Sequence, residues 1–292
     1  MAHPTRIHWS HVADGVPVGS PDVARWESLS FPQPRPDRPW IFGVMVASAN
    51  GVVAWRRRDP DDNPVRAILG GDDRPERIAD RRLMRYLRTI GDAGIGAQTV
   101  REQPRLVLTP QEPGDEPAPD LYAFRIARGL SYHPRNVVYS LYGRLSLDHP
   151  IFTTPGLDAI VVTTPAGADI LRGRPTAKPV ALLVEPLLQR EGLVRAHRRL
   201  FADHGIRYLA CEGGQTLLNA LHQADLLDEV FLTGTDVVID TNAHDGVITT
   251  FDFRAEQAEL VAEGRTTRGS GYSFQRWRFR KPGGDASPRR DS

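Results

Sequence analysis

Residues 208–218 read Tyr-Leu-Ala-Cys-Glu-Gly-Gly-Gln-Thr-Leu-Leu. An apolar run meets two glycines and then changes to helical spacing, in which apolar residues recur as far as Ala224. A second apolar run begins at Val230, so we predict a strand, a tight turn, a helix and a second strand. The free backbone N–H groups at the start of such a helix suit a phosphate, and Gly213 and Gly214 would let a ligand approach the backbone. A glycine pair in this position is also common as a plain turn.

Composition limits the class of protein. The chain has 292 residues, of which 40% are hydrophobic, and 37 basic residues nearly balance 36 acidic ones. This balance gives no broad basic face, so we expect no nucleic-acid partner. The single cysteine, Cys211, excludes an intrachain disulfide, and its place in an apolar strand predicts a buried thiol. No histidines have the helical spacing of a metal site, so we expect no metal.

No apolar stretch is long enough to span a bilayer, and the first residues lack the apolar core of a signal peptide. We therefore expect a cytoplasmic protein with no membrane partner. Residues 1–38 form an N-terminal extension that ends in a proline-rich linker and is expected to hold a short helix at 21–29. The main domain is predicted over 39–281 and a disordered tail over 282–292.

Short apolar runs alternate with amphipathic segments across the main domain. Strands are predicted near residues 40–47, 93–96, 136–140, 159–163, 181–184, 208–211, 230–233 and 272–279, and helices at 77–90, 165–171, 187–204 and 216–223. This alternation predicts an α/β fold with a mainly parallel central sheet, helices on both faces and an antiparallel C-terminal strand. Two inserts interrupt the pattern: residues 55–75 are predicted to be a solvated loop, and residues 103–128 a surface excursion.

Four segments, in order, resemble one family. Residues 46–54 (VASANGVVA) are similar to its first-strand motif A-S-L-D-G-x-x-A, and residues 87–100 (LRTIGDAGIGAQTV) to L-R-x-x-x-D-A-x-x-x-G-x-x-T-V. The other two are residues 137–147 (VVYSLYGRLSL) and residues 212–217 (EGGQTL), the latter followed by LLDE at 226–229. Together they resemble the reductase domain of bacterial riboflavin biosynthesis, which is similar in fold to dihydrofolate reductase. The resemblance covers roughly residues 39–281.

This resemblance implies an NADPH-dependent reduction of a pyrimidine ribosylamine phosphate in a homodimer. The residues that it places against the cofactor are Val46 and Ala47 at the nicotinamide, Thr99 and Ser140 through their hydroxyls, and Gly213, Gly214, Gln215, Thr216 and Leu217 along the phosphates. It places Arg88 at the substrate phosphate and Glu212 beside the nicotinamide, with Leu106 as a weaker candidate for the pocket wall. It assigns no catalytic residue. Local roles also fit these residues: a helix end for Arg88, a turn for Glu212, a strand end for the hydroxyls and the core for Leu106.

The chain departs from the family pattern on the substrate side. Asn50 replaces the usual Asp, and the loop after Thr99 is one residue shorter and lacks two Asp residues, which Glu102 replaces only in part. The insert at 55–75 takes the place of a short covering loop and puts Asp72 and Arg74 there. Two alternatives therefore stay open: a paralogue that reduces a pterin-like or other substrate, and a non-catalytic NADPH-binding protein. For the cofactor 2′-phosphate, the candidates are Arg144 and the pair Thr163-Thr164.

Overall fold

The computed structural model describes residues 7–12, 31–59, 61–71, 74, 76–112, 114, 117–266 and 271–280. The helix expected at 21–29, the tail at 282–292 and Asp72 lie outside these residues. Among the described residues, no helix is both long and apolar enough to cross a membrane.

A ten-stranded sheet organises the molecule, in the order β1-β11-β12-β9-β2-β8-β4-β5-β6-β7. Its strands are β1 (Ile7–Val12), β2 (Trp40–Ala47), β4 (Asp92–Gly96), β5 (Asn136–Ser140), β6 (Ala159–Thr163), β7 (Ala181–Val184), β8 (Tyr208–Cys211), β9 (Leu227–Thr235), β11 (Glu259–Thr266) and β12 (Tyr272–Arg278). The pairings from β9 to β7 are parallel, whereas β12, β11 and β1 add antiparallel strands at the other side.

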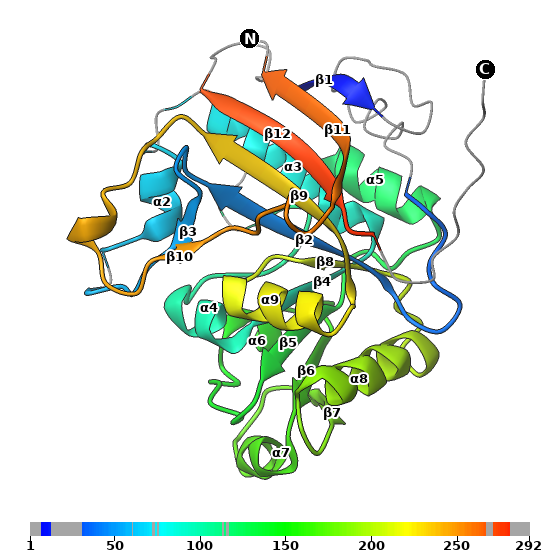
Figure 1. Ribbon diagram of the computed structural model, residues 1–292. Helices are drawn as coiled ribbons and strands as arrows, with labels where there is room; N and C mark the ends of the chain where they lie inside the picture. Colours follow the sequence, from blue (N-terminus) through cyan, green and yellow to red (C-terminus); the bar gives the residue numbers. More distant parts are fainter. Residues whose placement is uncertain are drawn as a thin grey trace.

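Helices cover both faces of this sheet. Helices α8 (Arg190–Ala202) and α9 (Gln215–Gln223) lie in front of it in Figure 1, whereas α3 (Glu76–Ile90) and α5 (Pro119–Ala127) lie behind. Every residue of β5 and β6 is buried, because parallel strands between two helical layers face apolar side chains on both sides. The predicted fold class is confirmed: an α/β protein with a mainly parallel sheet and antiparallel C-terminal pairing.

Shorter elements fill the connections. They are β3 (Val52–Ala54), α2 (Pro64–Ile68), α4 (Ala97–Glu102), α6 (Pro150–Thr153), α7 (Pro165–Arg172), the 3₁₀ turn η1 (Thr241–Ala243) and β10 (Ile248–Thr249). Strand β10 pairs with β3 in a separate two-stranded sheet. The insert at 55–75 thus contains a helix, α2, whose N-cap Asn63 accepts a hydrogen bond from the Arg66 backbone N–H.

The prediction that residues 103–128 form a surface excursion is wrong. Leu108 and Leu121 are fully buried, and the Asn136 side chain both donates to and accepts from the Leu108 backbone. The prolines that suggested a surface loop are compatible with this burial. Pro119 occupies the first turn of α5, where a missing N–H costs no hydrogen bond.

Candidate active site

The carboxyl ends of four neighbouring parallel strands, β2, β8, β4 and β5, lie side by side in the sheet. Backbone hydrogen bonds continue past the ends of the strands: Gly96 N donates to Gly213 O (2.8 Å), and Glu212 N donates to Gly94 O (2.9 Å). Ligands of open α/β sheets bind in the crevice outside such carboxyl ends. The predicted site residues, apart from Arg88 and Leu106, follow these ends in a row.

The glycine pair makes the turn from β8 into α9. Gly213 has φ +94°, a conformation that side-chain-bearing residues rarely adopt, and Gly214 is the exposed N-cap of the helix. No side chain caps this end, so the partial positive charge of the α9 N-terminus has no side-chain partner. A Cβ built on Gly214 would lie 3.8 Å from Thr99 Oγ1, which brings the predicted hydroxyl donor to the glycine turn.

The other predicted cofactor residues differ in how exposed they are along this row. Thr216 is exposed and Leu217 half-buried, whereas Gln215 is buried with its Oε1 atom lacking a hydrogen-bond partner. Ser140 ends β5 with 3% of its surface exposed. At the opposite end of the row, β2 closes with Val46, which is half-buried, and Ala47, which is buried in the core. The structure therefore brings Thr99 and Gly214 together, with Ser140 and β2 on either side.

Arg88 lies inside the protein. Its Nε and Nη2 atoms donate to the two carboxylate oxygens of Glu212 (2.5 and 2.7 Å), while Nη1 donates to Glu112 Oε1 and Thr109 O. Burial lowers the pKa of the guanidinium, but the charges of Glu212 and Glu112 more than offset this, so its pKa is raised. Arg88 and Glu212, predicted as separate substrate contacts, are thus one buried ion pair. Only 1% of the Arg88 side chain is exposed, so this arrangement does not present it to a substrate phosphate.

Asp80 is a candidate that sequence reasoning missed. It lies on α3, and its carboxylate accepts a hydrogen bond from Thr233 Oγ1 (2.6 Å); Thr233 is paired in register with Val46. Burial and the charge of Glu212 raise the pKa of Asp80, against the Thr233 hydrogen bond and the charge of Arg77. The only available signal was its position two helical turns before Arg88 on the same helix.

Leu106 packs into a hydrophobic cluster with Val100, Leu145 and Phe152, so the local alternative, a core residue, describes its contacts. The residues at which the chain departs from the family pattern have structural partners. Asn50 bonds to both backbone groups of Ile239.

Glu102 and Arg74 also have partners. Glu102 lies 3.9 Å from Arg57, and Arg74 pairs with Asp236. The insert at 55–75 is therefore tied to α4 on one side and to the end of β9 on the other.

The predicted buried thiol is confirmed. Cys211 is fully buried in β8, and burial raises its pKa to about 12, so it is not a nucleophile at neutral pH. Across the described ranges, no group of three or more His, Cys, Asp or Glu side chains could hold a metal ion.

Comparison with solved structures identifies the fold. A pyrimidine reductase-like protein from Corynebacterium diphtheriae superposes with a TM-score of 0.61 at 18% identity, over 84% of this chain and 94% of that one. The riboflavin biosynthesis reductase Rib7 of Saccharomyces cerevisiae gives a TM-score of 0.52 at 14% identity, over 84% and 92% of the two chains.

Acinetobacter baumannii RibD gives a TM-score of 0.56 at 17% identity, and the match covers 84% of this chain but 59% of that protein. No protein-family model and no curated protein matches the sequence. The resemblance seen in the four sequence segments is thus confirmed as a shared fold, that of the riboflavin-pathway pyrimidine reductases.

Proposed function

We propose that this chain is an NADPH-dependent reductase that transfers a hydride to a small polar heterocycle, of the kind reduced in riboflavin biosynthesis. The observation that carries this proposal is the row of groups along the carboxyl edge of the sheet. The open N-terminus of α9 and the Thr99 hydroxyl stand at its middle, and a buried cluster of charged groups stands at one side. The fold shared with the pyrimidine reductases supports the same proposal.

The middle of the row fits a dinucleotide. Gly214 is exposed, and a Cβ built there meets only Thr99, so the backbone N–H groups that follow it are accessible to a diphosphate. Val46 provides apolar surface for a planar ring at the end of β2, next to the buried Ala47. When bound, the nicotinamide supplies the hydride. The residues of the chain bind it and exclude water from it.

The charged side of the row fits a heterocycle rich in N–H donors. Glu212 and Asp80 carry carboxylates that accept hydrogen bonds, and Arg88 holds Glu212 by two parallel bonds. Because burial raises the pKa of Asp80, this carboxyl keeps its proton to higher pH than an ordinary aspartate. The hydrogen bond from Thr233, the residue opposite Val46, places this carboxyl near the β2 end of the row.

The direct test is NADPH oxidation by the purified protein with 5-amino-6-ribosylamino-pyrimidinedione 5′-phosphate, with NADH run in parallel. Turnover with NADPH establishes the proposed reaction. Activity with a dihydropterin alone identifies a paralogue that has changed substrate. Saturable NADPH binding without hydride transfer to any acceptor identifies a non-catalytic binding protein and contradicts the proposal.

Gly214→Val tests the cofactor position. The backbone of Gly214 has φ −67° and ψ 178°, which valine adopts readily, so the variant should fold. The added side chain blocks the approach to α9 and should weaken NADPH binding by about tenfold or more, or about 1.4 kcal/mol. Fluorescence titration measures this affinity. The affinity of Gly214→Ala should lie between those of Gly214→Val and the native chain. Unchanged affinity in a valine variant with a native melting temperature would remove the glycine turn from the site.

A further inference from the structure

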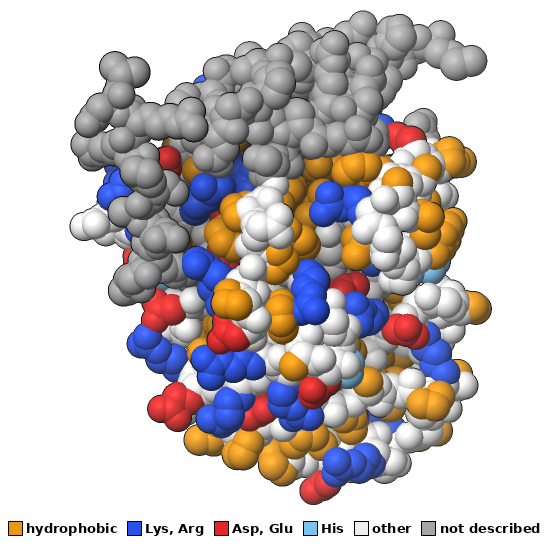
Figure 2. Space-filling model, turned by 90° about the vertical axis from the view of Figure 1, so that its right-hand side faces the viewer, with side chains coloured by type: hydrophobic (Ala, Val, Ile, Leu, Met, Phe, Trp, Pro, Cys, Tyr) orange, Lys and Arg blue, Asp and Glu red, His pale blue; other side chains and the backbone are white. Residues whose placement is uncertain are grey.

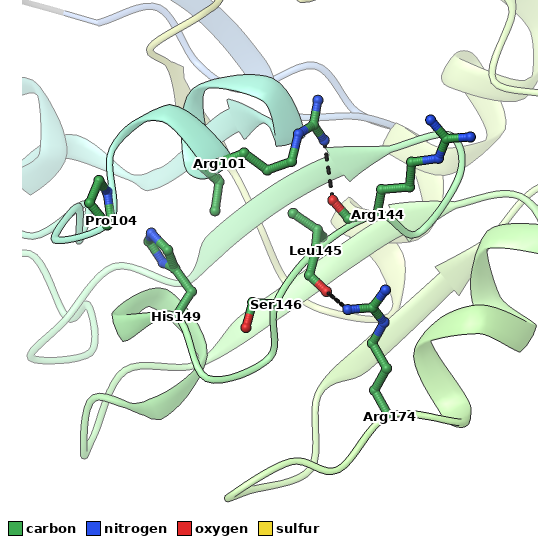
Figure 3. A pocket seen from close by; sticks show the side chains of 8 residues that line it. Arg101, Pro104, Arg144, Leu145, Ser146, His149 and Arg174 are labelled. Carbon is green, nitrogen blue, oxygen red and sulfur yellow. Dashed lines mark hydrogen bonds between the residues drawn. The ribbon is translucent and has the colours of Figure 1, made fainter. Parts of the chain in front are cut away.

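A pocket of about 530 Å³ opens beside α4 (Figure 3). Three segments line it: the C-terminal half of α4 with Pro104, residues 144–149 after β5, and Arg174 after α7. Val100 and Leu145 give it an apolar floor, since both belong to the hydrophobic cluster beneath. Apart from Pro104, the rest of the lining is polar or basic.

Three arginines, Arg101, Arg144 and Arg174, line this pocket, and no carboxylate does. None of the three forms an ion pair with any acidic side chain in the described part of the chain. What sets these three apart is that they gather in one pocket without a carboxylate, whereas the chain has a net charge of +1 and its basic and acidic side chains are interspersed on the face drawn in Figure 2. The neighbouring Arg172, outside the pocket, is paired with Asp169 at 2.9 Å.

Hydrogen bonds to the main chain fix two of these arginines. Arg101 Nη1 donates to Arg144 O (3.2 Å), and Arg174 Nη1 donates to Leu145 O (2.8 Å), as the dashed lines of Figure 3 show. Each guanidinium has five N–H donors, so most of them stay available to a ligand. His149 does not share in this role: its Nε2 faces Gln103 O, and its Nδ1 accepts from Ile151 N.

The pocket continues the row described above. Arg101 is on the same short helix as Thr99, and Arg144 is on the segment that follows Ser140. The two threonine hydroxyls in this region that could also donate a hydrogen bond to a phosphate already have partners. Thr163 Oγ1 donates to Ser140 O, and Thr164 Oγ1 donates to Leu141 O.

We propose that this pocket binds a phosphomonoester dianion, with Arg101, Arg144 and Arg174 as its ligands. Planar guanidinium groups match the oxygen geometry of phosphate. Three positive charges without an acidic partner more than balance a dianion, and the Arg144 guanidinium, which lies over the Tyr142 ring at 5.5 Å, keeps its N–H donors. Two sources supply this chemistry. One is the 2′-phosphate of a cofactor bound along the row, which rests on the proposed function, and the other is a separate phosphorylated metabolite.

Calorimetric titration of the full chain with 2′,5′-ADP, 5′-ADP and inorganic phosphate distinguishes these sources without requiring turnover. If the site takes the 2′-phosphate, 2′,5′-ADP binds more tightly than 5′-ADP. Arg174→Ala and Arg144→Ala should then each reduce the ratio of the two affinities by about tenfold or more. The matched control is Arg172→Ala, which removes an exposed arginine next to the pocket and should change nothing.

Inorganic phosphate binding that depends on Arg174, with equal affinity for the two nucleotides, supports the separate metabolite. This result can be obtained even if neither NADPH nor NADH binds. In that case the proposed function is contradicted and the phosphate site is still supported. If Arg174→Ala and Arg144→Ala behave like Arg172→Ala with all three ligands, the pocket is a solvated surface and the proposal is overturned.

Discussion

Among single residues, Arg88 is the cation that two carboxylates, Glu212 and Glu112, share. Arg88→Ala would leave Glu212 and Glu112 buried or half-buried with no cation between them. Removing one partner of a buried ion pair costs about 3–5 kcal/mol, because the remaining charge is desolvated without compensation. We therefore expect Arg88→Ala to lower the free energy of unfolding by about this amount in urea denaturation.

Arg172→Ala provides the control, because its pair with Asp169 is exposed and should contribute less than about 1 kcal/mol. A loss for Arg88→Ala as small as that of the control would show that the Arg88 cluster is solvated. It would also restore Arg88 as a free ligand for a substrate phosphate, as the sequence resemblance implied.

His197 makes stability depend on pH. It is fully buried on α8, with Nδ1 bonded to Leu193 O and Nε2 to the Tyr139 hydroxyl, and burial lowers its pKa to about 4. The unfolded chain binds a proton near pH 6.5, whereas the folded chain resists protonation down to about pH 4. The contribution of His197 is therefore present above pH 6.5 and is lost as the pH falls from 6.5 to about 4.

Over this window the loss should reach up to about 3 kcal/mol from His197 alone. Urea unfolding at a series of pH values measures it, and His197→Gln should flatten the slope between pH 6.5 and 4. A slope that is the same in both proteins would assign the acid sensitivity to other groups.

At the scale of elements, strands that read as short apolar runs could be predicted, and so could β12, whereas β11 could not. The bounds of β2, β5, β6, β7 and β8 agree with the sequence prediction, because each reads as a short, mostly apolar run. Strand β11 reads Glu-Leu-Val-Ala-Glu-Gly-Arg-Thr and was missed, since it mixes charged residues with its buried ones. An antiparallel strand near the side of a sheet needs only one apolar face, and that signal is weak in so short a segment.

Part of the candidate site could be predicted from the sequence, and part could not. The meeting of Thr99 with Gly214 follows from two local motifs at neighbouring strand ends, so the sequence could predict it. The pairing of Glu112 with Arg88 and the position of Arg174 at the pocket could not be predicted. Both depend on how residues 103–128 and the segment after α7 pack, and neither segment carries a motif.

At the scale of the whole molecule, the sheet extends beyond the domain predicted over residues 39–281. Strand β1 pairs antiparallel with β11, from Ile7 opposite Thr266 to Val12 opposite Ala262. Without β1, the backbone N–H and C=O groups along one side of β11 would have no partner. An unpaired strand of this kind is a template for pairing with another chain.

We therefore expect a chain that begins at Phe31 to unfold at a lower temperature and to associate more readily than the full chain. Differential scanning calorimetry and sedimentation velocity measure the two effects, and removal of residues 282–292 serves as a control that leaves β1 in place. If the shortened chain is as stable and as monodisperse as the full one, β1 is dispensable. The main domain would then be independent of its N-terminal extension, as the boundary after residue 38 predicts.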